Sequence, residues 1–182
     1  MAQATEGSNP SLSAIQIKYY NDTTAIMIIR KAELADKDIV LELLDQFRTD
    51  CIEQITGVPT ESHSARDGGR EIFETLLDRS DYCILLLVSP NSGAVGIITG
   101  YLCPMLRNGK VRSEVEEFFV KKEYRGHGNA TILMDAFFAW SEEHHAQKVN
   151  LESENELVRA HGFYKKYGFE TKAQRFIKKI NS

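Results

Sequence analysis

The sequence predicts a single α/β (α+β) domain with a mixed, mostly antiparallel, twisted sheet of six to seven strands and helices on both faces. Three observations lead to this fold. Apolar strand-like segments at 83–88, 95–103 and 111–120 follow one another across short turns, which indicates an antiparallel meander. A glycine-containing turn then leads into a helical pattern, and a further strand follows at 148–151; such a crossover places two strands parallel in one sheet. The length of 182 residues fits one domain.

The chain divides into an N-terminal leader and the domain itself. Residues 1–24 are expected to form a flexible leader, with the β-prone segment 15–20 as a candidate extra edge strand. Residues 25–182 are expected to form the domain, with its first strand at 27–30. Apolar residues at helical spacing predict helices over residues 37–52, 70–78, 129–145 and 157–167.

Two further segments are predicted from turn chemistry and strand propensity. Residues 56–69 contain Gly, Pro and Ser and are predicted to form an open loop, and long loops of this kind often carry function. Gly168 stands where a left-handed helix C-cap is expected. The chain after it, 169–180, is predicted to give one or two last strands.

Composition and charge exclude several classes of protein. The formal net charge is −4, whereas nucleic-acid-binding domains are usually basic. The longest apolar run, 82–88, is far below the roughly 20 residues needed to span a bilayer. The cysteines Cys51, Cys83 and Cys103 are scattered, and no His, Cys, Asp or Glu set has metal-ligand spacing. We therefore expect a cytoplasmic protein without a signal peptide, with reduced thiols, no metal, and no nucleic-acid or membrane partner.

Residues 125–130 read Arg-Gly-His-Gly-Asn-Ala and join an acidic strand to a helix. Two glycines allow the backbone to turn tightly. The first turn of the helix offers N–H groups without intrahelical partners and the positive end of the helix dipole. Such a turn binds anions, most often phosphate. The alternative is a plain strand-to-helix connection that binds no ligand, in which the glycines serve only to let the backbone turn tightly.

The turn, the acidic strand before it and the later Ala-His-Gly-Phe-Tyr-Lys-Lys-Tyr-Gly-Phe segment at 160–169 together resemble the GNAT superfamily of acetyl-CoA-dependent N-acetyltransferases. The family signature is Arg or Gln, two residues, Gly, one residue, then Gly or Ala, and residues 125–130 satisfy it. Locally, residues 116–128 are most similar to the diamine and polyamine acetyltransferases. Two positions depart from the pattern, since Asn129 replaces a usual aliphatic residue and Leu157 stands at the usual asparagine position.

The resemblance implies acetyl-CoA as co-substrate, bound without a metal. Main-chain amides of the turn are expected to bind the pyrophosphate, and the Arg125 side chain to add charge. A main-chain N–H near the end of the acidic strand is expected to stabilise the thioester oxyanion, beside a bulge that opens a slot for pantetheine. The residues implied in cofactor binding are Phe119, Val120, Arg125, Gly126, His127, Gly128, Asn129 and Ala130.

The resemblance also implies an acid and a base. Adjacent residues on a strand point to opposite faces, so only one of Glu116 and Glu117 faces the cleft unless a bulge intervenes. It favours Glu116 as the base, with Glu117 as the second candidate, and burial raises a carboxyl pKa toward useful values. Tyr164 is implied as the acid that protonates the leaving thiolate; the alternative for this residue is a packed aromatic side chain.

The expected activity is direct transfer of the acetyl group of acetyl-CoA to a primary amine of a small, cationic acceptor. Acidic residues near the strand, among them Glu114 and Glu152, are expected to steer such a cation. The alternatives are acetylation of a protein lysine or N-terminal amine, and a non-catalytic acyl-CoA-binding module. Members of the family often dimerise, so a homodimer is expected.

Overall fold

The computed structural model describes residues 17–20 and 26–180. Most of the predicted leader, residues 1–16 and 21–25, lies outside the described residues. The chain forms two compact units, Met1–Glu152 and Ser153–Ser182, and each is described by itself below.

The first unit contains one sheet with the strand order β1-β2-β3-β4-β5-β6 in the described residues. Neighbouring strands are antiparallel except β5 and β6, which are parallel. The prediction of a mixed, mostly antiparallel sheet is therefore confirmed, with six strands. Their bounds are Ile17–Tyr20 (β1), Ile26–Lys31 (β2), Tyr82–Ser89 (β3), Gly93–Met105 (β4), Lys110–Val120 (β5) and Ala146–Leu151 (β6).

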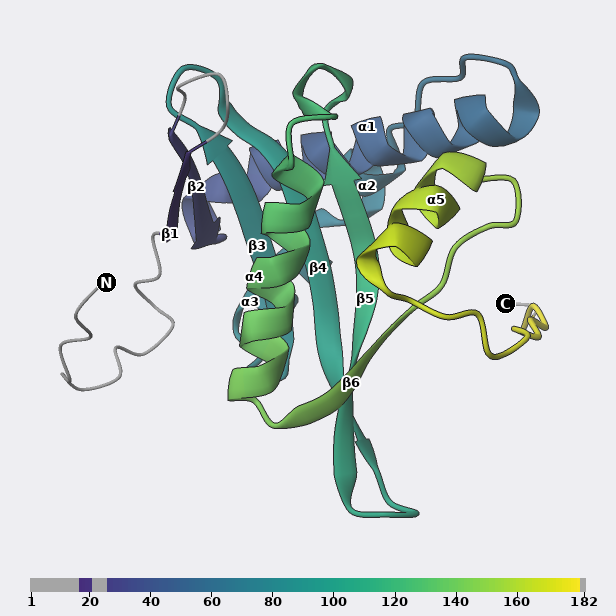
Figure 1. Cartoon of the computed structure of the whole chain (residues 1–182). Coiled ribbons are helices and arrows are strands. Elements are labelled where there is room, and N and C mark those ends of the chain that lie inside the picture. Colours follow the sequence, from purple (N-terminus) through teal and green to yellow (C-terminus); the bar gives the residue numbers. More distant parts are fainter. Residues whose placement is uncertain (1–16, 21–25, 181–182) are drawn as a thin grey trace, which may run out of the picture. The chain divides into compact units, whose positions relative to one another are not determined.

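Helices cover both faces of this sheet, as predicted (Figure 1). Helices α1 and α3 pack on one face and α4 on the other. None of the helices in the described ranges is both long and apolar enough to cross a bilayer. The helices of the first unit are Leu34–Asp36 (η2, 3-10), Lys37–Thr56 (α1), Ser64–Gly68 (α2), Arg70–Leu77 (α3), Lys122–Tyr124 (η3, 3-10) and Asn129–Glu143 (α4).

The core between the sheet and α1 is built from alternate strand residues. Leu86 of β3 and Ile97 of β4 are fully buried and pair across the two strands. They pack with Leu43 of α1 and Phe73 of α3 in one apolar cluster. Since residues at alternate positions of a strand share a face, this cluster fixes which side chains of β3, β4 and β5 point toward α1.

The opposite face is packed by α4, and Gly100 of β4 is the closest point of approach. A Cβ atom added at Gly100 would lie 2.6 Å from Phe137 and 2.2 Å from the Glu114 carbonyl oxygen. Only glycine fits there. Phe137 and Trp140 of α4 are buried, with ring centroids 5.3 Å apart.

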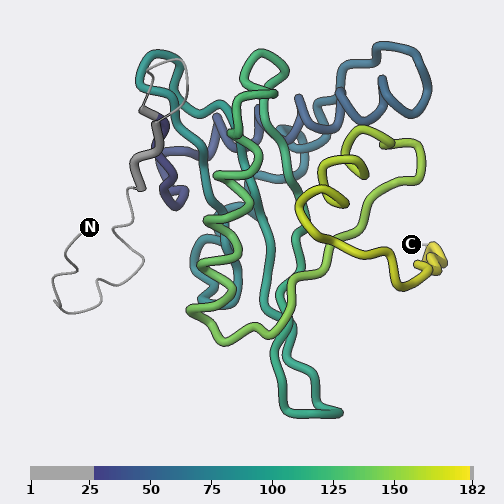
Figure 2. Tube along the Cα trace, viewed as in Figure 1, coloured from purple at the N-terminus to yellow at the C-terminus, as the bar shows by residue number. Residues whose placement is uncertain are grey.

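The long β4–β5 hairpin extends beyond the neighbouring strands (Figure 2). Its turn uses Gly109 at φ 65°, in the region that favours glycine. Asn108 precedes this glycine, and Asn-Gly is a favoured pair in tight hairpin turns.

The second unit contains helix α5 (Val158–Tyr167), which ends at Gly168 in the predicted left-handed conformation with φ 107°. The prediction of one or two last strands at 169–180 is wrong, because this segment has neither strand nor helix. Its apolar residues Phe176, Ile177 and Ile180 are exposed. A strand needs a partner for its main-chain groups and cover for its apolar face, and charged residues interrupt the apolar pattern here.

Candidate active site

A β-bulge in β5 determines where its glutamates point. Thr99 of β4 pairs with Glu117, but the next residue, Gly100, pairs with Val115. Glu116 is therefore the extra residue of the bulge. In a regular strand, two residues three positions apart point to opposite faces. Because of the bulge, Glu114 and Glu117 instead lie on the same face of the sheet as Thr99.

Glu117 is half-buried and bound to Thr99 by two hydrogen bonds. The Thr99 hydroxyl donates to Glu117 Oε2, and the Glu117 main-chain N–H donates to Thr99 Oγ1 at 3.1 Å. Burial raises the pKa of Glu117 to about 7, with a further contribution from the negative charge of Glu116. Glu116 itself is exposed. The geometry thus favours Glu117 over Glu116 as a proton acceptor near neutral pH.

Two tyrosines adjoin this carboxylate. The rings of Tyr82 on β3 and Tyr101 on β4 stack with centroids 6.4 Å apart. Burial raises the pKa of Tyr82, and the charge of Glu117 raises it further. Tyr82 therefore stays protonated as a neutral phenol beside the glutamate. Together these rings form an aromatic wall next to Glu117.

The glycine turn lies between β5 and α4. Gly126 and Gly128 have φ values of 87° and 77°, and a Cβ at either position would meet no atom within 4 Å. Gly128 is the N-cap of α4, and in the described residues no side chain caps this end. The first turn of a helix offers N–H groups without intrahelical partners, and the space beside the two glycines suits an anion.

Asn129, one of the two departures from the family pattern, stabilises this turn. It is buried, and its Nδ2 donates to the Tyr124 carbonyl oxygen at 2.8 Å. The amide thus ties the start of α4 to the segment before the glycines. His127 is exposed and Ala130 half-buried.

The Arg125 side chain does not point away from the protein toward an anion. Its Nε donates to the Val120 carbonyl oxygen at 2.7 Å and its Nη2 lies 2.9 Å from Asp50 of α1. Its guanidinium also lies 5.4 Å from the centroid of Phe119. Arg125 therefore joins the turn to α1, and its side-chain charge is already paired.

The pairing of β5 with β6 ends early. Val115 pairs with Leu151, the last residue of β6, whereas β5 continues to Val120. In the described part of the sheet, residues 116–120 have a strand partner on the β4 side alone. A slot for pantetheine was expected at this part of β5, and that role of the edge stays a prediction. The bulge lies at Glu116 and alters pairing with β4, while the open edge arises because β6 ends.

A cavity of about 450 Å³ lies between α1, the loop after it and the start of the turn. It touches Phe119, which is two residues from Glu117 and on the same face of β5, although Glu117 does not line it. Acidic side chains outnumber basic ones two to one. The lining residues are Glu42, Asp45, Gln46, Thr49, Asp50, Glu53, Glu61, Ser62, Arg66, Phe119, Lys121, Lys122 and Glu123.

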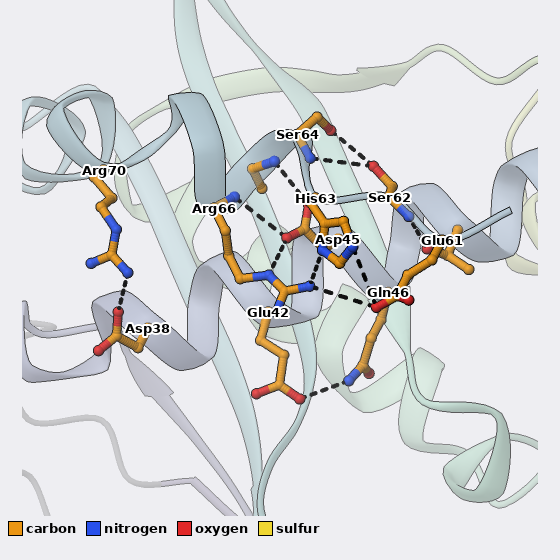
Figure 3. Close-up of polar contacts among 12 residues, drawn as sticks. Asp38, Glu42, Asp45, Gln46, Glu61, Ser62, His63, Ser64, Arg66 and Arg70 are labelled. Carbon is orange, nitrogen blue, oxygen red and sulfur yellow. Dashed lines mark hydrogen bonds and ion pairs between the residues drawn. The ribbon is translucent and has the colours of Figure 1, made fainter.

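The loop that borders this cavity is folded against α1 (Figure 3). Asp45, which is 2% exposed, accepts hydrogen bonds from the Ala65 N–H at 2.8 Å and from Arg66 Nε at 2.6 Å. Arg66 Nη2 lies 2.7 Å from His63 Nδ1. The predicted open loop therefore contains a short helix, α2, whose start is bound by a buried carboxylate.

Tyr164 lies on α5 in the second unit. Its ring makes edge contacts with Phe163 at 5.8 Å and Phe169 at 5.9 Å between centroids. Its carbonyl oxygen accepts the Gly168 N–H that ends the helix. Its role as the acid stays a prediction.

Thr99, Tyr82 and Asp45 were not predicted as site residues. Each lies far along the chain from the residue that it contacts, and a buried threonine in an apolar strand gives no signal of its own. In the described ranges, no group of three or more His, Cys, Asp or Glu side chains is placed to hold a metal ion.

Comparison with known proteins identifies the family. Residues 43–169 match the acetyltransferase (GNAT) family. The chain belongs to this family of acetyltransferases, which use acetyl-CoA as co-substrate. No curated protein matches the chain.

Solved structures share the fold at low sequence identity. A transcriptional regulator from Bacillus halodurans C-125 is 16% identical with a TM-score of 0.70, covering 85% of this chain and 99% of its own. An aminoglycoside acetyltransferase from an uncultured soil metagenomic sample is 16% identical with a TM-score of 0.67 and the same coverages. A ribosomal-protein-alanine N-acetyltransferase from Brucella melitensis is 18% identical with a TM-score of 0.63, again covering 85% and 99%.

Proposed function

We propose that this acetyltransferase transfers the acetyl group of acetyl-CoA directly to a primary amine of a small, cationic acceptor, with Glu117 as the general base. The observation that carries the proposal is the half-buried Glu117 carboxylate, whose pKa is raised to about 7. It lies on β5 next to the strand edge that β6 leaves open. A carboxylate with this pKa is half deprotonated near neutral pH, where a general base works best.

The turn between β5 and α4 fits the pyrophosphate of acetyl-CoA. Main-chain N–H groups at the start of α4 are the proposed donors, with Gly126 and Gly128 giving them space. Because the Arg125 side chain is paired with Asp50, it supports the turn from behind. The Arg125 main-chain N–H also bonds within the protein, to the Lys122 carbonyl oxygen at 3.2 Å.

Of Phe119 and Val120, Val120 is the better candidate for the residue whose main-chain N–H stabilises the thioester oxyanion. The Lys121 N–H bonds to the Val95 carbonyl oxygen on β4. Main-chain groups of successive strand residues point to alternate sides, so those of Val120 point toward the open edge. There its carbonyl oxygen accepts Arg125 Nε, and its N–H is placed for a thioester oxygen.

In the proposed reaction Glu117 takes a proton from the acceptor ammonium, directly or through one water. The free amine then attacks the thioester carbonyl carbon and a C–N bond forms. The nitrogen loses its second proton to solvent, and the C–S bond breaks to give the amide and a thiolate. The Val120 N–H stabilises the oxyanion. Tyr164 is proposed to protonate the thiolate that leaves.

The charge of the cavity supports a cationic acceptor. Six of its lining residues are acidic, namely Glu42, Asp45, Asp50, Glu53, Glu61 and Glu123. An acidic cavity raises the local concentration of a cation. A diamine or polyamine is the acceptor class suggested by the local resemblance of 116–128, and an aminoglycoside is the class named for one structural neighbour. A cytoplasmic homodimer remains the expected assembly.

The folded loop disfavours the alternative of a protein acceptor. A peptide strand needs an open groove, and the loop 57–69 is bound to α1 through Asp45. The ribosomal-protein acetyltransferase among the structural neighbours shows the fold alone at 18% identity.

The test is release of free thiol from acetyl-CoA with the purified full chain and a panel of diamines, polyamines, aminoglycosides and a lysine peptide. We expect turnover with small cationic amines. Glu117→Gln should lower kcat by about 100-fold or more, the range of a general base. Glu116→Gln should cost less than about threefold, because its exposed charge acts only at a distance.

Turnover with the lysine peptide and with none of the small amines would contradict a small-molecule acceptor and support a protein acceptor. Acetyl-CoA binding without turnover on any amine would leave the non-catalytic acyl-CoA-binding alternative. A larger loss with Glu116→Gln than with Glu117→Gln would move the base to the bulge residue.

A further inference from the structure

Thr99 is a polar residue in an apolar stretch of β4. It is 2% exposed, and residues 94–98 before it are all buried. A buried hydroxyl is costly unless its hydrogen bonds are made. Thr99 makes two of these bonds with Glu117, as donor to Oε2 and as acceptor from the main-chain N–H. The Tyr82 phenol also lies within hydrogen-bonding reach of the Thr99 side chain.

These two bonds fix both ends of Glu117. The N–H bond holds the main chain beside the bulge, where the ladder with β4 is irregular. The hydroxyl bond holds one carboxylate oxygen, which leaves Oε1 as the other proton-accepting atom. Since a β-branched side chain has few χ1 rotamers, the Thr99 hydroxyl is fixed by its own backbone.

We propose that Thr99 is the positioning residue for the base: its hydroxyl orients the Glu117 carboxylate and stabilises the charged form. This inference rests on the proposed function, in which Glu117 takes the proton from the acceptor. It adds a residue that acts through Glu117 and that contacts no reacting atom.

The charges around Glu117 make such a donor important. Glu116 on the same strand raises the pKa of Glu117, as does burial. Tyr82 on β3 lies near Glu117. Tyr101 stacks on the Tyr82 ring, and the Arg79 guanidinium lies 6.0 Å from the centroid of the Tyr82 ring. In the part of the chain that the structure describes, no basic side chain forms an ion pair with Glu117. Among the described residues, the Thr99 hydroxyl donates a side-chain hydrogen bond to this carboxylate, and such a bond favours the deprotonated form.

The experiment compares Thr99→Val with Thr99→Ser. Valine has nearly the same shape without the hydroxyl, whereas serine keeps it. In Thr99→Val we expect the acidic limb of the kcat profile, near pH 7 in the parent protein, to move up by about one to two pH units, the equivalent of one hydrogen bond to a charged group. At pH 7 this lowers kcat by about 5-fold to 50-fold, in proportion to the deprotonated fraction of Glu117. Thr99→Ser should stay within about threefold of the parent.

A direct titration makes the test independent of any acceptor. The Glu117 carboxyl carbon is followed by 13C NMR in the full chain, with Glu117→Gln used to assign its signal. The midpoint should rise in Thr99→Val and return in Thr99→Ser. Thr75→Val is the matched control, because it removes an exposed hydroxyl that bonds to the main chain of α3 and should leave the midpoint unchanged.

The outcomes separate the two proposals. An unchanged Glu117 midpoint in folded Thr99→Val overturns the positioning role of Thr99 whatever Glu117 does in catalysis. A raised midpoint together with full turnover in Glu117→Gln shows that Thr99 tunes a carboxylate that is not the base, and this overturns both. Folding of each variant is checked by its thermal transition.

Discussion

The guanidinium of Arg125 and the carboxylate of Asp50 form an ion pair of 2.9 Å that joins the glycine turn to helix α1. Their side chains are 17% and 10% exposed. Arg125 lies at the first position of the family signature, yet its side chain faces the protein. The glycine turn is therefore held by α1, the helix that also forms one wall of the acidic cavity.

Asp50→Asn should loosen the turn. The substitution leaves the largely buried Arg125 charge without its partner, so we expect a loss of about 1–3 kcal/mol in the free energy of unfolding. Acetyl-CoA affinity should fall as well, because the turn is less fixed. Chemical denaturation and calorimetric titration with acetyl-CoA measure the two effects. Glu53→Gln, which removes the exposed ion pair with Lys122, should cost less than about 1 kcal/mol. Equal effects of both variants would contradict a specific role for Asp50.

Gly128→Ala should strain the N-terminus of α4. The residue has φ 77°, where an alanine costs about 1–2 kcal/mol. Its added methyl group also projects into the space that the pyrophosphate is expected to occupy, so the Kd of acetyl-CoA should rise by at least tenfold. The comparison is Gly162→Ala within helix α5, where φ is not positive and alanine is favoured by about 0.5–1 kcal/mol. Thermal unfolding with and without acetyl-CoA gives both values; an unaltered Kd in Gly128→Ala would remove the turn from the cofactor site.

The raised pKa of Glu117 predicts a pH-dependent stability. The folded-state pKa is about 7 against 4.5 for the free side chain, so the folded form holds its proton longer than the unfolded one. Stability is therefore lost as the pH rises from about 4.5 to about 7 and stays low above that. Glu117→Gln should remove this loss of about 1–3 kcal/mol. The measurement is the free energy of unfolding of parent and variant at pH 5 and pH 8. The same difference between the two proteins at both pH values would show that the Glu117 pKa is not raised.

The sequence predicted the elements that have strong local signals. The apolar period of α4, the continuous apolar run of β3 and the glycine at 168 all lie where expected. The tight turn predicted at 125–130 is also present. Gly126 and Gly128 have positive φ values there, and glycine is the local signal that made the turn predictable. The strand prediction at 169–180 failed. A strand forms only beside a partner strand, and the partner can lie far away in the sequence, where local signals do not reveal it.

The site was predicted in part, and the limits have a physical cause. Both glutamates were found, but alternation along a regular strand could not tell which one faces inward. That depends on the bulge at Glu116, which lies where β4 passes from Thr99 to Gly100 and has no signature in β5 itself. The inward side chain of Arg125 was also missed, because Asp50 is 75 residues away in the sequence.

Because β6 ends at Leu151, one edge of β5 has no neighbouring strand beyond Val115 in the described part of the sheet. Beyond Leu151, residues 116–120 of β5 keep a row of main-chain donors and acceptors without a neighbouring strand in the described part of the sheet. Groups of this kind pair readily with any extended chain of amides. The pantetheine arm of acetyl-CoA carries two amides, so it can bind as a short seventh strand of limited length. In the proposed site, part of the co-substrate would be bound by the same kind of main-chain ladder that holds the sheet together, and side-chain substitutions along β5 would leave that ladder unaltered.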